Sequence, residues 1–390
     1  MTIDVLLNGE RAPIERSVFV ALLENSVVHD RAPYRHALEK GELSFADLTD
    51  LARKSQIPYS LFFAPAEFVA EQVKAKNAKL LQGVAPDTFT INSRSTVHLR
   101  DIELIVKDLL RKQAFVKRYD STLTRNPILG VLRHLRPTAK EDADDVLKAL
   151  ALDRSEIRAT RSKEAARDLL IERLEAKQVL VSQSVRGYMP QLLDVKFSGM
   201  TVRDAKVPYI FLAGGDHLDY QEPAGRQVFT LTLMAVLVAR GIFKPVTYDA
   251  NATAPDPGRE YDVVGEILMP AEDIRGFDLN SLEGLRLAAD GLKVTPSALA
   301  VRAMRLQQLT FETGDGFLRA LEAEFKGRAK KRASTPKPVN AIRKYSGREL
   351  TRRTLALLDD KKISAGDFCR VVCLNKIRPA QIGELKEAIH

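Results

Sequence analysis

The residues best suited to hold a metal ion lie in one short polar segment. Asp216, His217 and Asp219 follow two glycines and precede a long apolar stretch. Carboxylate and imidazole groups spaced two or three positions apart can converge on one ion. The two glycines equally favour a surface turn between a strand and a helix. We interpret the segment as such a turn and keep a metal site as the alternative.

Other candidate nucleophiles and bases stand apart from one another. Ser184 and Ser198 have no neighbouring His and acid in the sequence, as a Ser-His-Asp arrangement would suggest, although partners distant in sequence can meet in a fold. His134 lies among Arg133 and Arg136, a pattern more typical of a solvated face than of a catalytic base. No Gly-rich phosphate loop follows an expected strand. The sequence therefore gives no support for nucleotide hydrolysis.

The two cysteines, Cys369 and Cys373, lie four positions apart in a segment with a helical pattern. They have none of the additional Cys or His ligands that a structural zinc site requires. We expect both to be reduced thiols packed in a core. We predict neither a bound metal nor a cofactor.

The composition is that of an ordinary globular protein. The chain has 390 residues, of which 45% are hydrophobic and 28% are charged. This length corresponds to about two to four domains, and the composition excludes disordered, collagen-like and disulfide-stapled proteins. No signal peptide opens the chain, and its longest apolar stretch, 228–239, is shorter than the ~20 residues that span a bilayer. We expect a soluble, cytoplasmic protein with no membrane contact.

Basic residues are concentrated toward the C-terminus. The net charge is +9, yet residues 1–65 carry seven Lys and Arg against nine Asp and Glu. Residues 326–390 carry seventeen basic against six acidic side chains, and the middle of the chain is neutral overall. If the protein binds a polyanion by counterion release, these numbers predict that the C-terminal segment does so.

The spacing of apolar residues predicts a mostly helical chain. Segment 229–243 is apolar nearly all round, which indicates a helix enclosed by protein on every side. Segment 326–338 holds two prolines and six basic residues, which is typical of a linker. Short strands are expected at 3–9, 179–181, 195–202 and 207–212. The expected helices cover 17–25, 33–39, 45–52, 101–115, 140–152, 162–177, 229–243, 261–269, 279–287, 296–309, 316–325, 347–358, 365–372 and 379–389.

Several segments resemble one protein family, in the same order along the chain. Residues 37–65 resemble the back half of a phage-repressor-like (XRE) helix-turn-helix domain, of the kind that is fused to ImmA/IrrE-type metallopeptidases. Residues 164–181 are similar to the helix and strand that open the peptidase core in those fusions, and residues 347–364 resemble the helical tail that often follows. The motifs that carry the resemblance are Pro58-Tyr59-Ser60-Leu61-Phe62-Phe63, Phe197-Ser198-Gly199-Met200-Thr201, Pro208-Tyr209-Ile210-Phe211-Leu212, Phe229-Thr230-Leu231 and Leu268-Met269-Pro270.

The resemblance implies an α+β fold that is mainly helical. It would contain a degenerate N-terminal helix-turn-helix, a degenerate zincin-like core with a small sheet, and a C-terminal helical tail. The implied divisions are a helix-turn-helix-like domain (1–65), a helical scaffold (66–190), a zincin-like pseudopeptidase core (191–325), a basic linker (326–345) and a basic helical domain (346–390).

The chemistry that defines this family is missing from the sequence. In the family, Phe-Thr-Leu leads into a helix with His-Glu-x-x-His, whose imidazoles bind zinc while the Glu activates the bound water. The resemblance places Leu233 and Leu237 on the two His positions and Met234 on the Glu position. A third ligand would fall near Pro257, beside Asp256 and Glu260. Because Leu and Met neither bind Zn²⁺ usefully nor carry a proton, we predict a pseudoenzyme.

Two regions are candidates for contact with double-stranded DNA. At the N-terminus, the expected second helix begins near Arg31 and would present Arg31 and Arg35, with a packing or dimerisation domain as the alternative. At the C-terminus, segments 365–372 and 379–389 have helix-turn-helix proportions, with a merely solvated basic surface as the alternative. The candidate phosphate contacts there are Lys330, Lys331, Arg332, Arg352, Arg353, Lys376 and Arg378.

These expectations lead to one functional hypothesis and three alternatives. The hypothesis is a catalytically inactive regulator that binds DNA or a repressor in a phage, mobile-element or stress-response circuit. The first alternative is an antirepressor or antitoxin-like protein that sequesters a repressor or toxin. The second is an active metallopeptidase with non-standard ligands such as Asp216, His217 and Asp256. The third is a structural or defence-system component that only scaffolds other proteins, and a homodimer is compatible with all of them.

Overall fold

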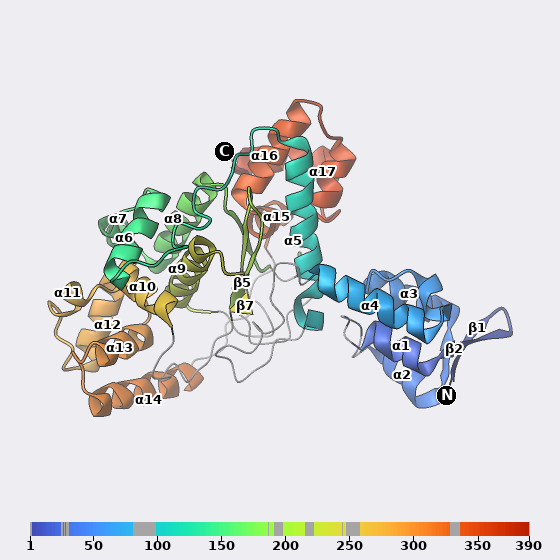
Figure 1. Cartoon of the computed structure of the whole chain (residues 1–390), viewed down its shortest axis with the longest axis horizontal. Coiled ribbons are helices and arrows are strands. Elements are labelled where there is room, and N and C mark those ends of the chain that lie inside the picture. The colour runs from blue at the N-terminus through green and yellow to red at the C-terminus, as the bar shows by residue number, and fades with distance from the viewer. Residues whose placement is uncertain are drawn as a thin grey trace.

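The computed structural model describes residues 2–24, 26, 28, 31–80, 99–185, 187–190, 198–214, 222–243, 245–246, 258–327 and 336–389. The chain is mainly helical and contains two small sheets, in agreement with the expected α+β class (Figure 1). We refer to residues 2–80 as the N-terminal unit, because they share one hydrophobic core that is separate from those of the later residues.

The N-terminal unit is built on a three-stranded sheet of order β2-β1-β3. β1 (Thr2–Leu7) and β2 (Glu10–Glu15) form an antiparallel hairpin, and β3 (Glu42–Ser44) pairs parallel to β1. The hairpin turns at Asn8 and Gly9, which both have positive φ, as a two-residue turn requires. The sequence patterns did not predict β2, because its charges and Pro13 mask the alternation. Pro13 is tolerated because β2 is an edge strand.

The helices of this unit begin and end close to the expected positions. α2 ends at Gly41, whose left-handed conformation closes the helix, and the Ser44 hydroxyl accepts the Asp47 N–H at 3.0 Å to cap α3. α4 packs on α1 through the buried Val69, so it belongs to this unit although a boundary was expected at 65. The bounds are α1 Arg16–Leu23, α2 Ala32–Lys40, α3 Phe45–Lys54, η1 Tyr59–Phe63 and α4 Ala66–Leu80.

A four-stranded sheet of order β4-β6-β5-β7 lies at the centre of the remaining chain. β4 (Leu180–Gln183) and β6 (Tyr209–Leu212) are parallel, whereas β5 (Gly199–Val202) is antiparallel to β6 and to β7 (Pro245–Val246). The first three strands confirm those expected from the sequence within the described residues. The two-residue β7 was too short to predict.

Helices pack on both faces of this sheet, on two hydrophobic cores. The larger core runs from Ile128 to Leu309 and joins residues of the expected helical scaffold to residues of the expected core domain, whereas α5 packs on the other core. None of the helices in the described part of the chain is long and apolar enough to cross a membrane. The bounds are α5 Leu99–Tyr119, α6 Ala139–Leu150, α7 Arg154–Ala159, α8 Lys163–Ala176, α9 Ala224–Arg240, α10 Arg259–Leu268, α11 Ala271–Ile274, α12 Leu282–Gly291, α13 Pro296–Arg305 and α14 Phe311–Gly327.

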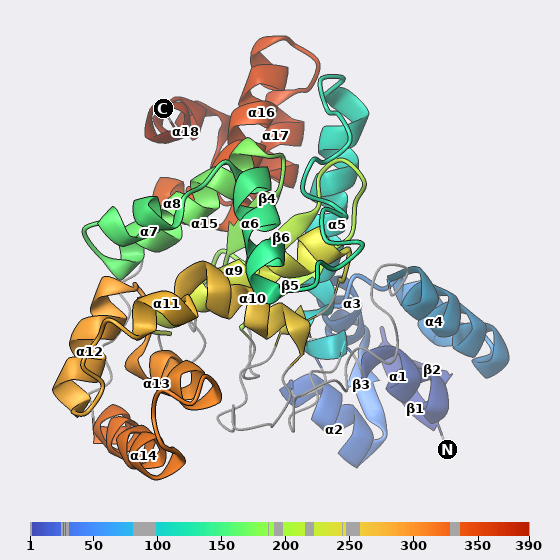
Figure 2. The ribbon, with the colours of Figure 1, turned by 60° about the vertical axis from the view of Figure 1, so that its left-hand side comes forward.

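The C-terminal helices cover the edge of the sheet at β4. α15 lies within the segment expected to be a linker, where Pro338 opens the helix and the buried Ile342 and Tyr345 face inward. The Ser182 hydroxyl of β4 donates to the Tyr345 carbonyl, and α16 also packs on β4 (Figure 2). The bounds are α15 Pro338–Ser346, α16 Arg348–Asp359, α17 Ala365–Val371, η3 Pro379–Gln381 and α18 Ile382–Ile389.

Three acidic side chains contact the C-terminal helices. Asp108 lies on α5, Asp120 directly follows α5, and Glu175 lies on α8. Asp108 accepts the Tyr345 hydroxyl at 2.8 Å, and Asp120 pairs with Arg353 at 2.7 Å. Glu175 of α8 lies at the amino end of α16, where the backbone N–H groups of residues 348 and 349 point toward its carboxyl group. All three acids are buried. The C-terminal helices are therefore an integral part of the fold.

Candidate functional site

Apolar side chains occupy the positions that would carry the zinc ligands and the general base in an ImmA/IrrE-type metallopeptidase. Leu233, Met234 and Leu237 lie on α9 and are at most 3% exposed. The Met234 side chain packs directly on Gly199 of β5, because a Cβ built on Gly199 would lie 2.8 Å from Met234 Sδ. The same Cβ would lie 2.5 Å from the Phe211 carbonyl oxygen. Helix and strand thus approach closely, with a methionine filling the space between them.

This close approach makes Gly199 sensitive to substitution. We expect Gly199→Ala to reduce the free energy of unfolding by about 2 kcal/mol, because the new methyl group collides with a backbone oxygen and a buried sulfur. Urea denaturation measures the loss. The control is Gly291→Ala on α12, where nothing lies within 4 Å of the added Cβ. Equal stabilities of the Gly199 and Gly291 variants would contradict the packing described for Met234.

Of the two acids beside the expected third ligand, the structure describes Glu260. Glu260, on α10, pairs with Arg240 at 3.0 Å. Within the described ranges, no three His, Cys, Asp or Glu side chains gather in a way that could hold a metal ion. The other candidates, Asp216, His217, Asp219 and Asp256, lie outside the described residues.

The two cysteines are free and buried, as expected. Burial raises the pKa of Cys373 to about 12, so its thiol stays protonated at neutral pH. Burial also raises the pKa of Cys369. Both thiols pack in the core of the C-terminal helices.

A polar cluster at the start of α9 was not singled out from the sequence. Glu222 is buried, and its Oε1 accepts a hydrogen bond from the Ser198 hydroxyl at 3.2 Å. Its backbone N–H donates to the Gly214 carbonyl at 3.0 Å, and its own carbonyl accepts from Gln227 Nε2 at 3.2 Å. Burial raises the pKa of Glu222 to about 7, while Arg226 and the Ser198 hydroxyl oppose that rise. Nothing in the local sequence marks this glutamate, because its neighbours come from separate segments.

The N-terminal candidates are exposed but isolated. Arg31 and Arg35 lie at the solvent-facing start of α2, whereas Tyr34 between them is buried and stacks on Phe19 with ring centroids 5.5 Å apart. β3 lies between α2 and α3 and is paired with β1, so the connection between these helices is part of a sheet. A helix-turn-helix normally joins its helices by a simple turn.

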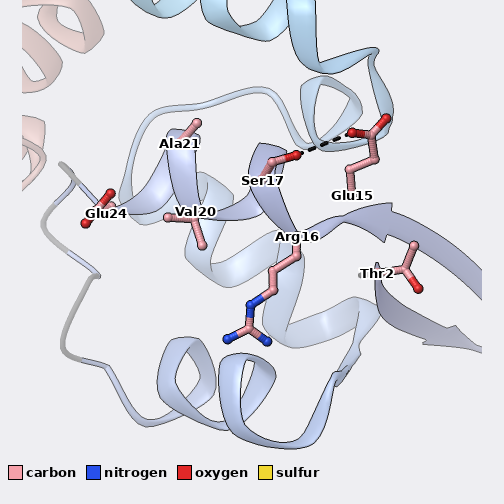
Figure 3. A pocket seen from close by; sticks show the side chains of 7 residues that line it. All are labelled: Thr2, Glu15, Arg16, Ser17, Val20, Ala21 and Glu24. Atoms are coloured by element: carbon pink, nitrogen blue, oxygen red, sulfur yellow. Dashed lines mark hydrogen bonds between the residues drawn. The ribbon is translucent and has the colours of Figure 1, made fainter.

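The N-terminal unit also contains a hollow of about 720 Å³ between the hairpin and α1 (Figure 3). The cation in its lining, Arg16, donates to the Leu38 carbonyl at 2.8 Å, so part of its guanidinium is already occupied. Two glutamates flank it, which makes the hollow a poor site for phosphate. The lining residues are Thr2, Glu15, Arg16, Ser17, Val20, Ala21 and Glu24.

The C-terminal candidates divide into paired and free cations. Arg353 is an internal residue, since its side chain is 13% exposed and pairs with Asp120 and Glu349. Arg352 is more exposed but pairs with Glu349 at 2.8 Å. Arg353 is therefore unsuited to a phosphate contact, whereas Arg352 is exposed and already paired with a carboxylate of its own helix.

Lys376 and Arg378, in contrast, are exposed and form no ion pair with any side chain in the described part of the chain. The remaining candidates, Lys330, Lys331 and Arg332, lie outside the described residues. The free cations of the C-terminal segment thus include two residues in the connection between α17 and η3.

The second helix of the expected C-terminal motif carries the wrong charge for reading bases. α17 and α18 are joined through a turn in which Leu374 and Asn375 have positive φ, followed by η3. The exposed face of α18 presents Glu384 and Glu387. Carboxylates on this face would repel phosphates, so α18 is unsuited to lie in a DNA groove.

The chain was compared with protein-family models, curated proteins and solved structures. No protein-family model matches the chain, and neither a curated protein nor a solved structure shows significant similarity to it.

Proposed function

We propose that this protein is a non-catalytic regulator that binds DNA through the backbone phosphates, using free cations in the connection between α17 and η3. In this proposal the central body is a degenerate zincin-like core of the ImmA/IrrE type, in which α9 serves packing and not hydrolysis. The burial of Leu233, Met234 and Leu237 supports that role for α9.

The observation that carries the DNA proposal is the pair of cations Lys376 and Arg378 beside the turn after α17, which are exposed and pair with no acid among the described residues. Phosphate contacts by such residues supply affinity without sequence specificity. The acidic face of α18 argues against base recognition, so the expected binding is electrostatic and strongly dependent on salt.

Neutralising these two cations should weaken DNA binding by about tenfold near physiological salt. The variant is Lys376→Gln with Arg378→Gln, and fluorescence anisotropy with a labelled duplex at several salt concentrations measures it. The slope of log K against log salt should fall by about two, one unit for each phosphate contact.

The matched control is Arg370→Gln, because Arg370 is exposed on the preceding helix, α17, but pairs with Asp367 at 2.5 Å. We expect this control to bind like the unmodified protein. Point variants are preferable to a truncation, since Tyr345 and Arg353 are built into the main body. Failure of the unmodified protein to bind the duplex, or unchanged binding by the double variant, would refute the proposed DNA site.

A second candidate function, the sequestration of a repressor or toxin, is favoured by exposed aromatic residues in the N-terminal unit. Tyr59, Phe63 and Phe68 are 52%, 42% and 48% exposed. Exposed large apolar side chains often mark protein-binding surfaces. Size-exclusion chromatography with the product of a neighbouring regulatory gene tests this candidate, which predicts a stable hetero-complex that is lost when all three residues are changed to Ser.

The metallopeptidase alternative is tested by metal analysis of the purified protein. With α9 packed as described, we expect no zinc to co-purify in a one-to-one ratio. Stoichiometric zinc that survives dialysis would restore the peptidase hypothesis and would require ligands outside the described residues.

A further inference from the structure

Glu222 is a buried carboxyl group that neither proposed function uses. It is 6% exposed, and its Oε2 has no hydrogen-bond partner among the described residues. Within the same part of the chain, its carboxyl group accepts a hydrogen bond only from a neutral donor, the Ser198 hydroxyl, at 3.2 Å. Burying an ionised carboxylate that has so few hydrogen bonds costs much desolvation free energy, whereas burying the protonated carboxyl group costs far less.

Glu222 also lies where three elements meet. Its backbone bonds join the end of β6, at Gly214, to the start of α9, at Gln227. Its side chain adds the amino end of β5, at Ser198. We propose that the protonation state of Glu222 is a switch that controls how firmly the start of α9 is held against β5 and β6.

Few charged groups surround this carboxyl group in the part of the chain that the structure describes. α9 contributes Arg226, which favours the ionised form. Arg167 of α8 is engaged by Gln227 Oε1 at 2.8 Å and by Asp168. The ends of the strands contribute two neutral groups, Ser198 and Ser184, of which Ser184 accepts the Gly214 N–H at 2.6 Å. Burial outweighs the effect of Arg226 and raises the pKa of Glu222 to about 7, within the range in which cellular pH varies.

Hydrogen exchange at two backbone amides tests the switch. The amide of Glu222 is bonded to the Gly214 carbonyl, and that of Ala213 to the Ser198 carbonyl at 3.0 Å. After correction for intrinsic exchange rates, we expect local opening to be about tenfold more frequent at pH 8 than at pH 6. In Glu222→Gln this pH dependence should disappear.

Two further variants separate the switch from a general loss of stability. Glu260→Gln removes a carboxyl group near the other end of α9, where it pairs with Arg240, and should keep the pH dependence of the unmodified protein. Ser198→Ala removes the hydroxyl that donates to the carboxylate and should move the midpoint of the opening to higher pH. Exchange that does not depend on pH, a dependence that persists in Glu222→Gln, or a midpoint that is unmoved in Ser198→Ala would each overturn the proposal.

Discussion

Replacing Lys112 by Met should lower the free energy of unfolding by about 3 kcal/mol, because it leaves a buried carboxylate without its main counter-ion. Lys112 Nζ lies 2.9 Å from Asp108 Oδ2, and both side chains are at most 1% exposed. The ammonium group also lies 4.1 Å from the centre of the Tyr345 ring. Methionine keeps the length of the side chain but removes the charge, so the loss reports on electrostatics more than on packing. Urea denaturation at neutral pH measures it.

The double variant Asp108→Asn with Lys112→Met is the control for this prediction. Removing both charges from a buried pair is far less costly than removing one, so the double variant should regain most of the lost stability. The Tyr345 hydroxyl, which donates to Asp108 Oδ2 at 2.8 Å, can donate equally to the amide oxygen that takes the place of that atom. A loss below about 1 kcal/mol in the single variant would show that the pair is not the buried anchor described here.

The second large effect concerns pH and Glu175. Burial raises the pKa of Glu175 to about 8, with the nearby Glu349 adding to the rise and the backbone N–H groups of residues 348 and 349 opposing it. The folded state therefore binds a proton that the unfolded chain releases near pH 4.5. This contribution to stability is fully present below pH 4.5 and is lost as the pH rises through about 8.

We expect the unfolding free energy to fall by at least about 3 kcal/mol over this range because of Glu175 alone. Glu175→Gln should flatten that part of the profile and stabilise the protein at pH 8.5. Glu172→Gln, one turn earlier on the exposed side of α8, is the matched control and should leave the profile unchanged. A profile that is as steep in Glu175→Gln as in the unmodified protein would contradict this account.

The elements that the sequence predicted best are those with local signals. The end of α2 at Gly41 and the start of α3 at Ser44 follow from glycine and serine chemistry within one turn of the helix. α9 was predicted to be enclosed on all sides because its apolar residues occupy every face, and residues 230–239 are buried. Elements with weak local signals, such as β2 and α15, were missed or taken as linker.

The sequence by itself determined the mainly helical α+β class, the apolar character of α9 and the excess of basic residues at the C-terminus. Only the tertiary structure decided which of those basic residues are free, because Arg353 meets Asp120 from a segment 233 positions away whereas Lys376 meets no acid among the described residues. It also decided that Glu222, Glu175 and Lys112 are buried. The Arg353–Asp120 pair and the burial of these three side chains depend on segments that are distant in the chain, so no local pattern encodes them.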